Sequence, residues 1–122
     1  MTSLEVSKLA AKALSAKKGL DIKVIKIEDI SVLADYMVIA TGTSSTQVKA
    51  MADNVEYELD NAGVSVSHIE GYRSNTWILM DYIDVIVHVF IDETREFYDL
   101  ERLWKDGEEE SMRLLDLQDD PR

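Results

Sequence analysis

Apolar residues recur at helical spacing near the start of the chain, over residues 3–18. Thr2 and Glu5 stand three residues apart, which is the spacing of a capping box at the start of a helix. Gly19 follows the segment and can adopt the left-handed conformation that ends a helix. The segment is therefore predicted to be an amphipathic helix. Its apolar stripe consists of Leu9, Ala10, Ala13 and Leu14.

A second helical pattern follows Ser44, which has capping-box spacing to Gln47. Apolar residues then repeat with the period of a helix, and Gly63 is predicted to close it. The apolar stripe of this helix is made of Val48, Met51, Ala52, Val55, Leu59 and Ala62.

Five shorter segments have the alternation or the apolar run that is typical of strands. In residues 22–27 apolar residues are interleaved with lysines, whereas residues 36–41 are apolar almost throughout, which predicts a central strand covered on both faces. Three further strands are predicted at about residues 64–69, 76–81 and 85–91. The connection between the last two is short, so these two are expected to form an antiparallel hairpin.

The end of the chain is predicted to contain one more helix and then an acidic tail. Asp92 or Thr94 can cap this helix. Its apolar side consists of Phe97, Leu100, Leu103 and Trp104. Residues 108–122 are expected to be disordered, because runs of carboxylates repel each other and bury little apolar surface. The alternative is one more helical turn that contains Met112, Leu114, Leu115 and Leu117.

The predicted fold is therefore α/β, with a mixed five-stranded sheet and flanking helices in the order α-β-β-α-β-β-β-α. Residues 1–107 form the expected domain. A chain of 122 residues can bury a sufficient core without a disulfide or a metal ion. It contains no cysteine, which is compatible with a reducing cytoplasm.

The chain has 24 acidic and 13 basic residues and a net charge of −11. Such a surface repels nucleic acid and anionic lipid, so a basic protein is the natural partner, although acidity can also serve solubility alone. No apolar run approaches the roughly 20 residues that span a bilayer. The first 18 residues lack the pattern of a signal peptide. We therefore expect a cytoplasmic protein.

The loop that contains Gly42 and Ser44 is the first candidate for chemistry, because it joins a strand to the start of a helix and can bind phosphate. It lacks the Gly-Lys-Ser/Thr ending of a phosphate-binding loop, and turn chemistry with a helix cap also explains it. A glycine-serine turn also occurs in nucleotidyltransferases, which need carboxylates on an adjacent strand to hold metal ions. Asp81 and Asp84 flank a turn, and nothing in their spacing brings them to Ser44.

The two histidines give no catalytic or metal-binding pattern. His88 lies in an apolar strand, where a lone histidine is usually a structural residue with a hydrogen-bond partner. His68, Glu70 and Asp81 lack the close spacing of metal ligands, and no Gly-x-Ser-x-Gly motif marks a nucleophile. We therefore predict no catalytic residue, no metal site and no cofactor.

Residues 76–81 form the most informative strand, because both of its faces are apolar. Alternation places Ile78 and Met80 on one face and Trp77 and Leu79 on the other. One face must join the core, and the second is either covered by a helix or offered to a partner. Tryptophan and tyrosine are favoured anchors of protein interfaces. Further aromatic surface is expected from Tyr72, Tyr82 and Tyr98.

Short segments along the chain have an order and spacing that together match one protein family. The first segments are Asp29-Ile30-Ser31, Leu33-Ala34-Asp35-Tyr36, Val38-Ile39-Ala40-Thr41-Gly42-Thr43-Ser44 and Gln47-Val48-Lys49-Ala50. The later ones are Glu70-Gly71, Trp77-Ile78-Leu79, Asp81-Tyr82, Asp84-Val85, Val87-His88-Val89-Phe90 and residues 95–104. With these segments the chain resembles the ribosomal silencing factors, also called Iojap-like proteins, over about residues 3–106.

This resemblance implies an α/β fold related to nucleotidyltransferases but without their catalytic carboxylates. It also implies binding to large-subunit ribosomal protein fourteen, where the factor blocks joining of the small subunit by its bulk and lowers translation when nutrients are scarce. The alternatives are an assembly factor of the large subunit and a metal-dependent nucleotidyltransferase, and a homodimer of the free protein is left open. The residues expected to contact the ribosomal partner are Trp77, Leu79, Asp81 and Tyr82, together with Tyr72 and Tyr98.

One position departs from the family pattern. Ile83 stands in the turn at a place where the family usually has glycine. A tight turn with a positive φ disfavours a β-branched residue. Either this hairpin uses another turn, or Ile83 is strained.

Overall fold

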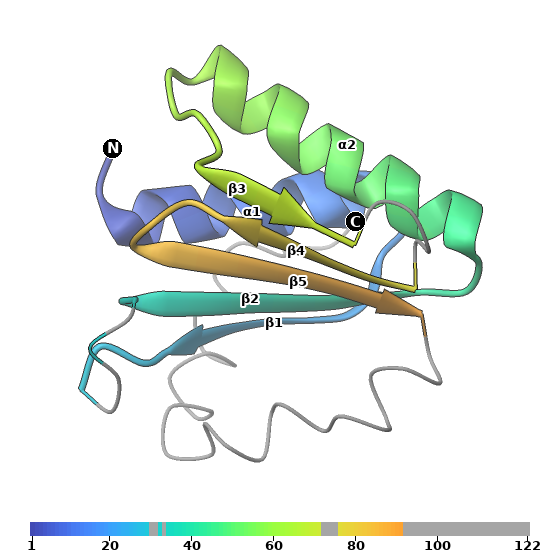
Figure 1. Ribbon diagram of the computed structural model, residues 1–122, viewed down its shortest axis with the longest axis horizontal. Coiled ribbons are helices and arrows are strands. Elements are labelled where there is room, and N and C mark those ends of the chain that lie inside the picture. The colour runs from blue at the N-terminus through green and yellow to red at the C-terminus, as the bar shows by residue number, and fades with distance from the viewer. Residues whose placement is uncertain (30–31, 33, 72–75, 92–122) are drawn as a thin grey trace.

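The computed structural model describes residues 1–29, 32, 34–71 and 76–91 (Figure 1). These ranges contain two helices and five strands. In chain order they are α1 (Ser3–Ala16), β1 (Leu20–Lys26), β2 (Tyr36–Gly42), α2 (Ser45–Asn61), β3 (His68–Glu70), β4 (Trp77–Asp81) and β5 (Val85–Ile91).

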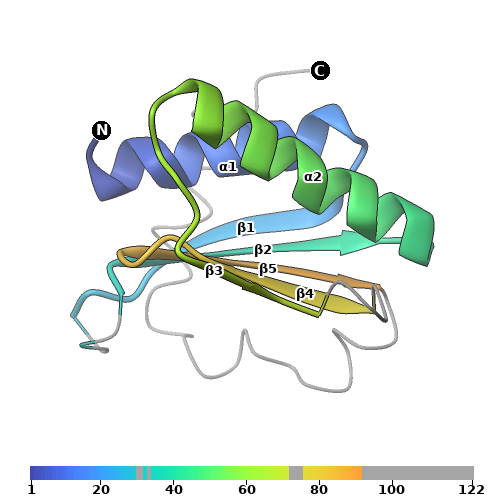
Figure 2. The ribbon, with the colours of Figure 1, turned by 45° about the horizontal axis from the view of Figure 1, so that its top comes forward.

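The five strands form one mixed sheet in the order β1-β2-β5-β4-β3. β2 and β5 are parallel neighbours, and the other neighbouring pairs are antiparallel. Both helices lie over the same face of the sheet (Figures 1 and 2). The predicted mixed five-stranded sheet and the β4–β5 hairpin are therefore confirmed. β2 lies inside the sheet and is buried along its whole length, as its apolar sequence predicted.

Some predictions concern residues that the structure does not describe. The helix predicted after residue 91 and the acidic tail at 108–122 both lie outside the described residues. The domain boundary at residue 107 and the relation to nucleotidyltransferases stay predictions. Neither of the two described helices is long and apolar enough to cross a membrane.

α1 begins where the sequence predicted. The Thr2 hydroxyl accepts a hydrogen bond from the Glu5 amide at 3.1 Å, and the Glu5 carboxylate accepts one from the Thr2 amide at 2.8 Å. This reciprocal pair is a capping box, and it satisfies amides that the helix itself leaves without partners. The hydrogen bond from the Thr2 amide to the carboxylate is the largest cause that lowers the pKa of Glu5.

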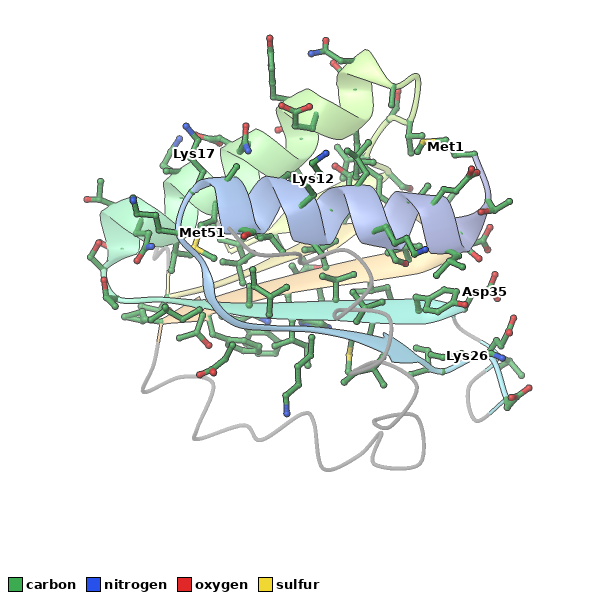
Figure 3. The ribbon with its side chains drawn as sticks, turned by 180° about the vertical axis from the view of Figure 1, so that it is seen from behind. Met1, Lys12, Lys17, Lys26, Asp35 and Met51 are labelled. Carbon is green, nitrogen blue, oxygen red and sulfur yellow. The ribbon has the colours of Figure 1, made fainter. Side chains whose placement is uncertain are left out.

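The predicted role of Gly19 at the other end of α1 is wrong, because Lys18 takes the left-handed conformation instead, with a φ of 65°. A side chain at Gly19 would be crowded by its neighbours. A Cβ on it would lie 2.7 Å from the Cε of Met51 and 3.0 Å from the carbonyl oxygen of Leu14. Figure 3 shows Met51 beside this end of α1. After α2, by contrast, Gly63 does have a positive φ of 85°, as predicted.

α2 is capped by Ser44, whose hydroxyl accepts a hydrogen bond from the Gln47 amide at 3.1 Å. The Gln47 side chain does not complete a capping box. Its Oε1 accepts from the Thr43 amide at 2.7 Å, and its Nε2 donates to the carbonyls of Lys17 at 3.1 Å and Lys18 at 3.0 Å. One side chain thus ties the start of α2 to the end of α1.

The main core fills the layer between the helices and the sheet. Neighbouring residues of a strand face opposite sides, so alternate positions of β2, β4 and β5 reach this layer. Each fully buried Val, Leu, Ile or Met side chain there contributes about 1.5–3 kcal/mol to stability. α2 contributes Val48, Met51, Ala52, Val55 and Leu59 to the core.

Candidate protein-binding surface

The candidate site lies on the sheet face opposite α1 and α2, which we call the second face. β4 places Trp77, Leu79 and Asp81 on this face, all partly exposed. Ile78 and Met80 are 0% exposed and belong to the helix-side core, which confirms the predicted alternation. Neither described helix covers the second face (Figure 2). Neither α1 nor α2 lies over Trp77, and the helix predicted after residue 91 lies outside the described residues, so burial of Trp77 beneath a helix stays untested.

Neighbouring strands extend this surface on both sides of β4. Glu70 of β3 is paired with Leu79, and Asp81 is paired with His68 of β3 and with Ile86 of β5. Paired residues of antiparallel strands point to the same face. His68 Nε2 and the Glu70 carboxylate lie 2.9 Å apart, and both side chains are exposed. We define the β4 surface as His68, Glu70, Trp77, Leu79, Asp81 and Ile86.

The second face is more deeply buried towards β1 and β2. Ile25, Met37 and Ile39 belong to an apolar cluster that also includes Phe90 of β5. Trp77 and Ile86 are packed against this cluster and are only partly buried. The accessible part of the second face is therefore the half formed by β3 and β4.

Three aromatic rings support one end of the β4 surface. The indole Nε1 of Trp77 donates a hydrogen bond to Nδ1 of His88 at 3.0 Å. The Trp77 ring stacks on Phe90 with centroids 5.2 Å apart, and the His88 ring also stacks on Phe90, with centroids 5.9 Å apart. His88 is 7% exposed, and this burial lowers its pKa to about 4. The prediction of a structural histidine with a hydrogen-bond partner is confirmed.

The turn after β4 explains how an isoleucine replaces the glycine of the family pattern. Ile83 has a φ of 74°, and the Asp84 amide donates to the Tyr82 carbonyl at 2.9 Å across it. This bond and this angle are those of a γ-turn, which is strained for a β-branched residue. Asp81 Oδ1 accepts a hydrogen bond from the Ile83 amide at 2.7 Å and supports the turn. Of the two predicted explanations, strain at Ile83 is the correct one.

Tyr82 does not join the β4 surface. It is 7% exposed and belongs to the helix-side core with Ile78 and Met80, on the side where continued alternation of β4 places it. Its hydroxyl is buried and has no hydrogen-bond partner among the described residues. Burial, followed by the charges of Glu56 and Asp60 on α2, raises the pKa of Tyr82. This placement does not favour the predicted contact of Tyr82 with a partner.

Tyr72 and Tyr98 are the remaining predicted contacts. Both lie outside the described residues, so their roles stay predictions. The sequence interpretation missed Glu70, His88 and Ile86 as neighbours of the tryptophan strand. For His88 and Ile86, the short connection after β4 contained the signal, because a hairpin with a known turn fixes which residues are paired.

The loop around Ser44 is remote from the candidate carboxylate at Asp81. Gly42 is paired with Ile91 of β5, whereas Asp81 is paired with Ile86. Ile91 and Ile86 are five residues apart along β5, which is roughly 17 Å at the rise of a β-strand. The Ser44 hydroxyl is used as a helix cap. Within the described ranges, no group of three or more His, Asp or Glu side chains is placed to hold a metal ion.

Fold and surface together define a small α/β domain with two helices on one face of a mixed sheet and an apolar and acidic surface on the other. The family model described as "Ribosomal silencing factor during starvation" matches residues 1–122. The chain belongs to this family, and the resemblance drawn from its sequence segments is confirmed.

Individual relatives agree with this assignment. A Chromobacterium violaceum protein named ribosomal silencing factor RsfS is 44% identical over 100 residues, which is 82% of this chain and 82% of the relative. A crystal structure from the same organism matches with a TM-score of 0.84 at 43% identity and covers 86% of this chain and 88% of that chain. The mouse protein named mitochondrial assembly of ribosomal large subunit protein 1 is 33% identical over 87 residues, covering 69% of this chain and 38% of the relative.

Proposed function

We propose that this protein represses translation by binding the large ribosomal subunit through the β4 surface, at ribosomal protein fourteen, and blocking the joining of the small subunit. Family membership supports the ribosomal role. The observation that carries the choice of surface is β4 itself, which presents a large aromatic and an aliphatic side chain, both partly exposed, on a face that neither described helix covers.

The β4 surface has the composition of an interface centre with a polar rim. Trp77 and Leu79 supply apolar area that gains free energy when it is removed from water. Tryptophan is among the residues most often found to dominate binding energy. The polar rim consists of His68 and Glu70 of β3 and Asp81 of β4. These side chains can meet polar and charged groups at the edge of the interface.

Charge supports a basic partner. The chain has a net charge of −11, and Glu70 and Asp81 place two of its carboxylates on the β4 surface itself. Asp81 can hold the turn and meet a basic group together, because among the described residues only its Oδ1 is engaged in a hydrogen bond. Opposite charges of this kind speed association and fix orientation more than they increase affinity.

The proposed mechanism requires affinity and position but no chemical step. A folded domain seated on the face of the large subunit that meets the small subunit excludes it by volume. The protein then acts as a regulator in the cytoplasm, with no catalytic residue, metal ion or cofactor of its own.

The first test compares two substitutions of exposed or partly exposed aromatic residues. Trp77→Ala removes the anchor of the β4 surface, whereas Tyr57→Ala removes a 62% exposed ring from α2, on the opposite side of the sheet. Loss of a central tryptophan anchor costs about 2–4 kcal/mol, so Trp77→Ala is expected to weaken binding roughly 30- to 1,000-fold. Tyr57→Ala is expected to bind like the native chain. Affinity is measured for the large subunit and for isolated ribosomal protein fourteen.

Thermal melting of both variants accompanies this comparison, because Trp77 also packs against Phe90. A Trp77→Ala chain that melts cooperatively and still binds with native affinity would show that the β4 surface is not the contact. Equal weakening by both variants would lead to the same conclusion.

A role in assembly of the large subunit is the second candidate. The name of the mouse relative favours it, since that name refers to assembly of the ribosomal large subunit. Cells that lack the protein distinguish the two functions. Blocked joining predicts mature large subunits and a higher fraction of joined ribosomes in starved cells, whereas an assembly role predicts immature large-subunit particles with unprocessed RNA.

A further inference from the structure

We propose that His88 is a positioning residue of the β4 surface, whose Nδ1 holds the Trp77 indole in the orientation that meets the ribosomal partner. This inference rests on the proposed function, because it assigns to His88 a role in binding through Trp77. The hydrogen bond of 3.0 Å between Trp77 Nε1 and His88 Nδ1 is the observation that carries it.

The geometry of the hairpin makes this contact a diagonal one. Trp77 is paired with Phe90 and Leu79 is paired with His88, so the indole must lean along β5 to reach the imidazole. Diagonal neighbours on one sheet face are within reach of aromatic side chains. The indole N–H can only donate, and Nδ1 of a neutral histidine with its proton on Nε2 can only accept. The hydrogen bond therefore selects one orientation of the indole.

Two contacts together restrict the Trp77 ring. Stacking on Phe90, with an interplanar angle of 24° and centroids 5.2 Å apart, fixes the plane of the ring. A stacked ring can still turn within its plane or flip over. The hydrogen bond to His88 selects among these arrangements, since only one of them directs Nε1 to the imidazole.

His88 is suited to this role because it is itself held firmly. It is 7% exposed and lies on β5, the central strand of the sheet, between Ile39 of β2 and Leu79 of β4. Its ring stacks on Phe90 at an interplanar angle of 7°. Its burial keeps it neutral at physiological pH, so Nδ1 remains an acceptor.

A held indole binds better than a mobile one. A side chain that is free before binding loses rotational freedom when the interface forms, at a cost of roughly 0.5–1.5 kcal/mol. Fixing the ring in advance removes much of this cost. The alternative is that His88 only satisfies a half-buried N–H and has no effect on binding.

The test uses two variants of similar size that differ in one acceptor. Both variants lose the imidazole ring. His88→Asn keeps an acceptor oxygen near the position of Nδ1, whereas His88→Leu has no acceptor there. A single hydrogen bond contributes about 0.5–1.5 kcal/mol, so His88→Leu is expected to bind the large subunit roughly 2- to 12-fold more weakly than His88→Asn. Thermal melting confirms that each variant is folded.

The same substitution in a Trp77→Phe chain separates positioning from general damage. Phenylalanine has no N–H to be held, so His88→Leu and His88→Asn are expected to bind alike in that background. NMR adds a direct readout of the contact. The chain has 2 tryptophans, and the indole N–H signal of Trp77 is expected to be protected from exchange in the native and His88→Asn chains and unprotected in His88→Leu.

The outcomes separate this inference from the proposed function. If Trp77→Ala weakens binding but His88→Leu and His88→Asn bind equally, His88 does not position the indole and the proposed function stands. If the difference between Leu and Asn persists in the Trp77→Phe chain, His88 acts by another route and the inference is also wrong. If Trp77→Ala itself leaves binding unchanged, both proposals are wrong.

Discussion

At the scale of single residues, the second face of the sheet is organised around His88. Its Nδ1 accepts from Trp77, its ring stacks on Phe90, and its burial disfavours a proton on the imidazole. A buried neutral histidine couples stability to pH, because the unfolded chain exposes it to water and lets it bind the proton. The same residue thus connects the β4 surface to the stability of the domain.

The pH dependence of unfolding follows from this pKa. His88 titrates at about pH 4 in the folded protein and at 6.5 in its ordinary state, so stability is complete above about pH 6.5 and falls as pH decreases towards 4. Between pH 7 and pH 5 we expect a loss of about 2 kcal/mol from this residue. Urea unfolding at both pH values is measured for the native chain and for His88→Leu. The two chains differ only at residue 88, so the difference between them isolates His88; equal pH dependence would contradict the account.

Sequence reasoning at this scale succeeded where it followed the alternation along a strand and failed where it departed from it. Alternation separated Trp77 and Leu79 from Ile78 and Met80 correctly. The same alternation places Tyr82 on the side of Ile78 and Met80, so the prediction of Tyr82 as a contact residue went against the pattern. The Trp77–His88 contact also required the register of two strands, which no pattern in one strand contains.

At the scale of elements, the turn between β4 and β5 sets that register. Asp81 supports the turn through Oδ1, and the Asp84 carbonyl accepts from the amides of Asp35 and Tyr36 at the start of β2. The turn therefore connects the hairpin to the parallel strand. Ile83, at its tip, is 65% exposed and holds a positive φ at a steric cost.

Replacing Ile83 by glycine is expected to stabilise the domain. Glycine adopts a φ of 74° without steric cost, and little packing is lost because the isoleucine side chain is mostly exposed. The relief of strain exceeds the entropy that glycine adds to the unfolded chain, with a net gain of about 1 kcal/mol. The measurement is the free energy of unfolding in urea for Ile83→Gly and Ile83→Ala. Alanine removes most of the same side chain but keeps the Cβ, so equal stability of the two variants would show that the turn is unstrained.

Helix starts were predictable because their chemistry is local, whereas the end of α1 depended on packing. Thr2 and Glu5 form their capping box within one turn of chain. At the end of α1, the space beside Met51 and the hydrogen bonds from Gln47 decide the conformation. Both residues belong to α2 and lie about 30 positions away, so the neighbourhood of Gly19 in the sequence does not reveal them.

At the scale of the whole molecule, the two faces of the sheet have different roles. The helices bury one face of the sheet in the main core. The parallel neighbours β2 and β5 both contribute side chains to this core. The order of elements along the chain predicted a mixed sheet, but it did not predict the order of the strands within the sheet. That order brings β3 and β4 to one side, where the β4 surface is formed.

The central claim is that binding through the β4 surface keeps the ribosomal subunits apart. The most direct measurement is sedimentation of purified small and large subunits mixed with an excess of the native chain, of Trp77→Ala or of Tyr57→Ala. We expect the native chain and Tyr57→Ala to sediment with the large subunit and to lower the fraction of joined ribosomes. Trp77→Ala, at the same concentration, is expected to leave joining close to its level without factor. Full joining in the presence of native chain bound to the large subunit would contradict the account.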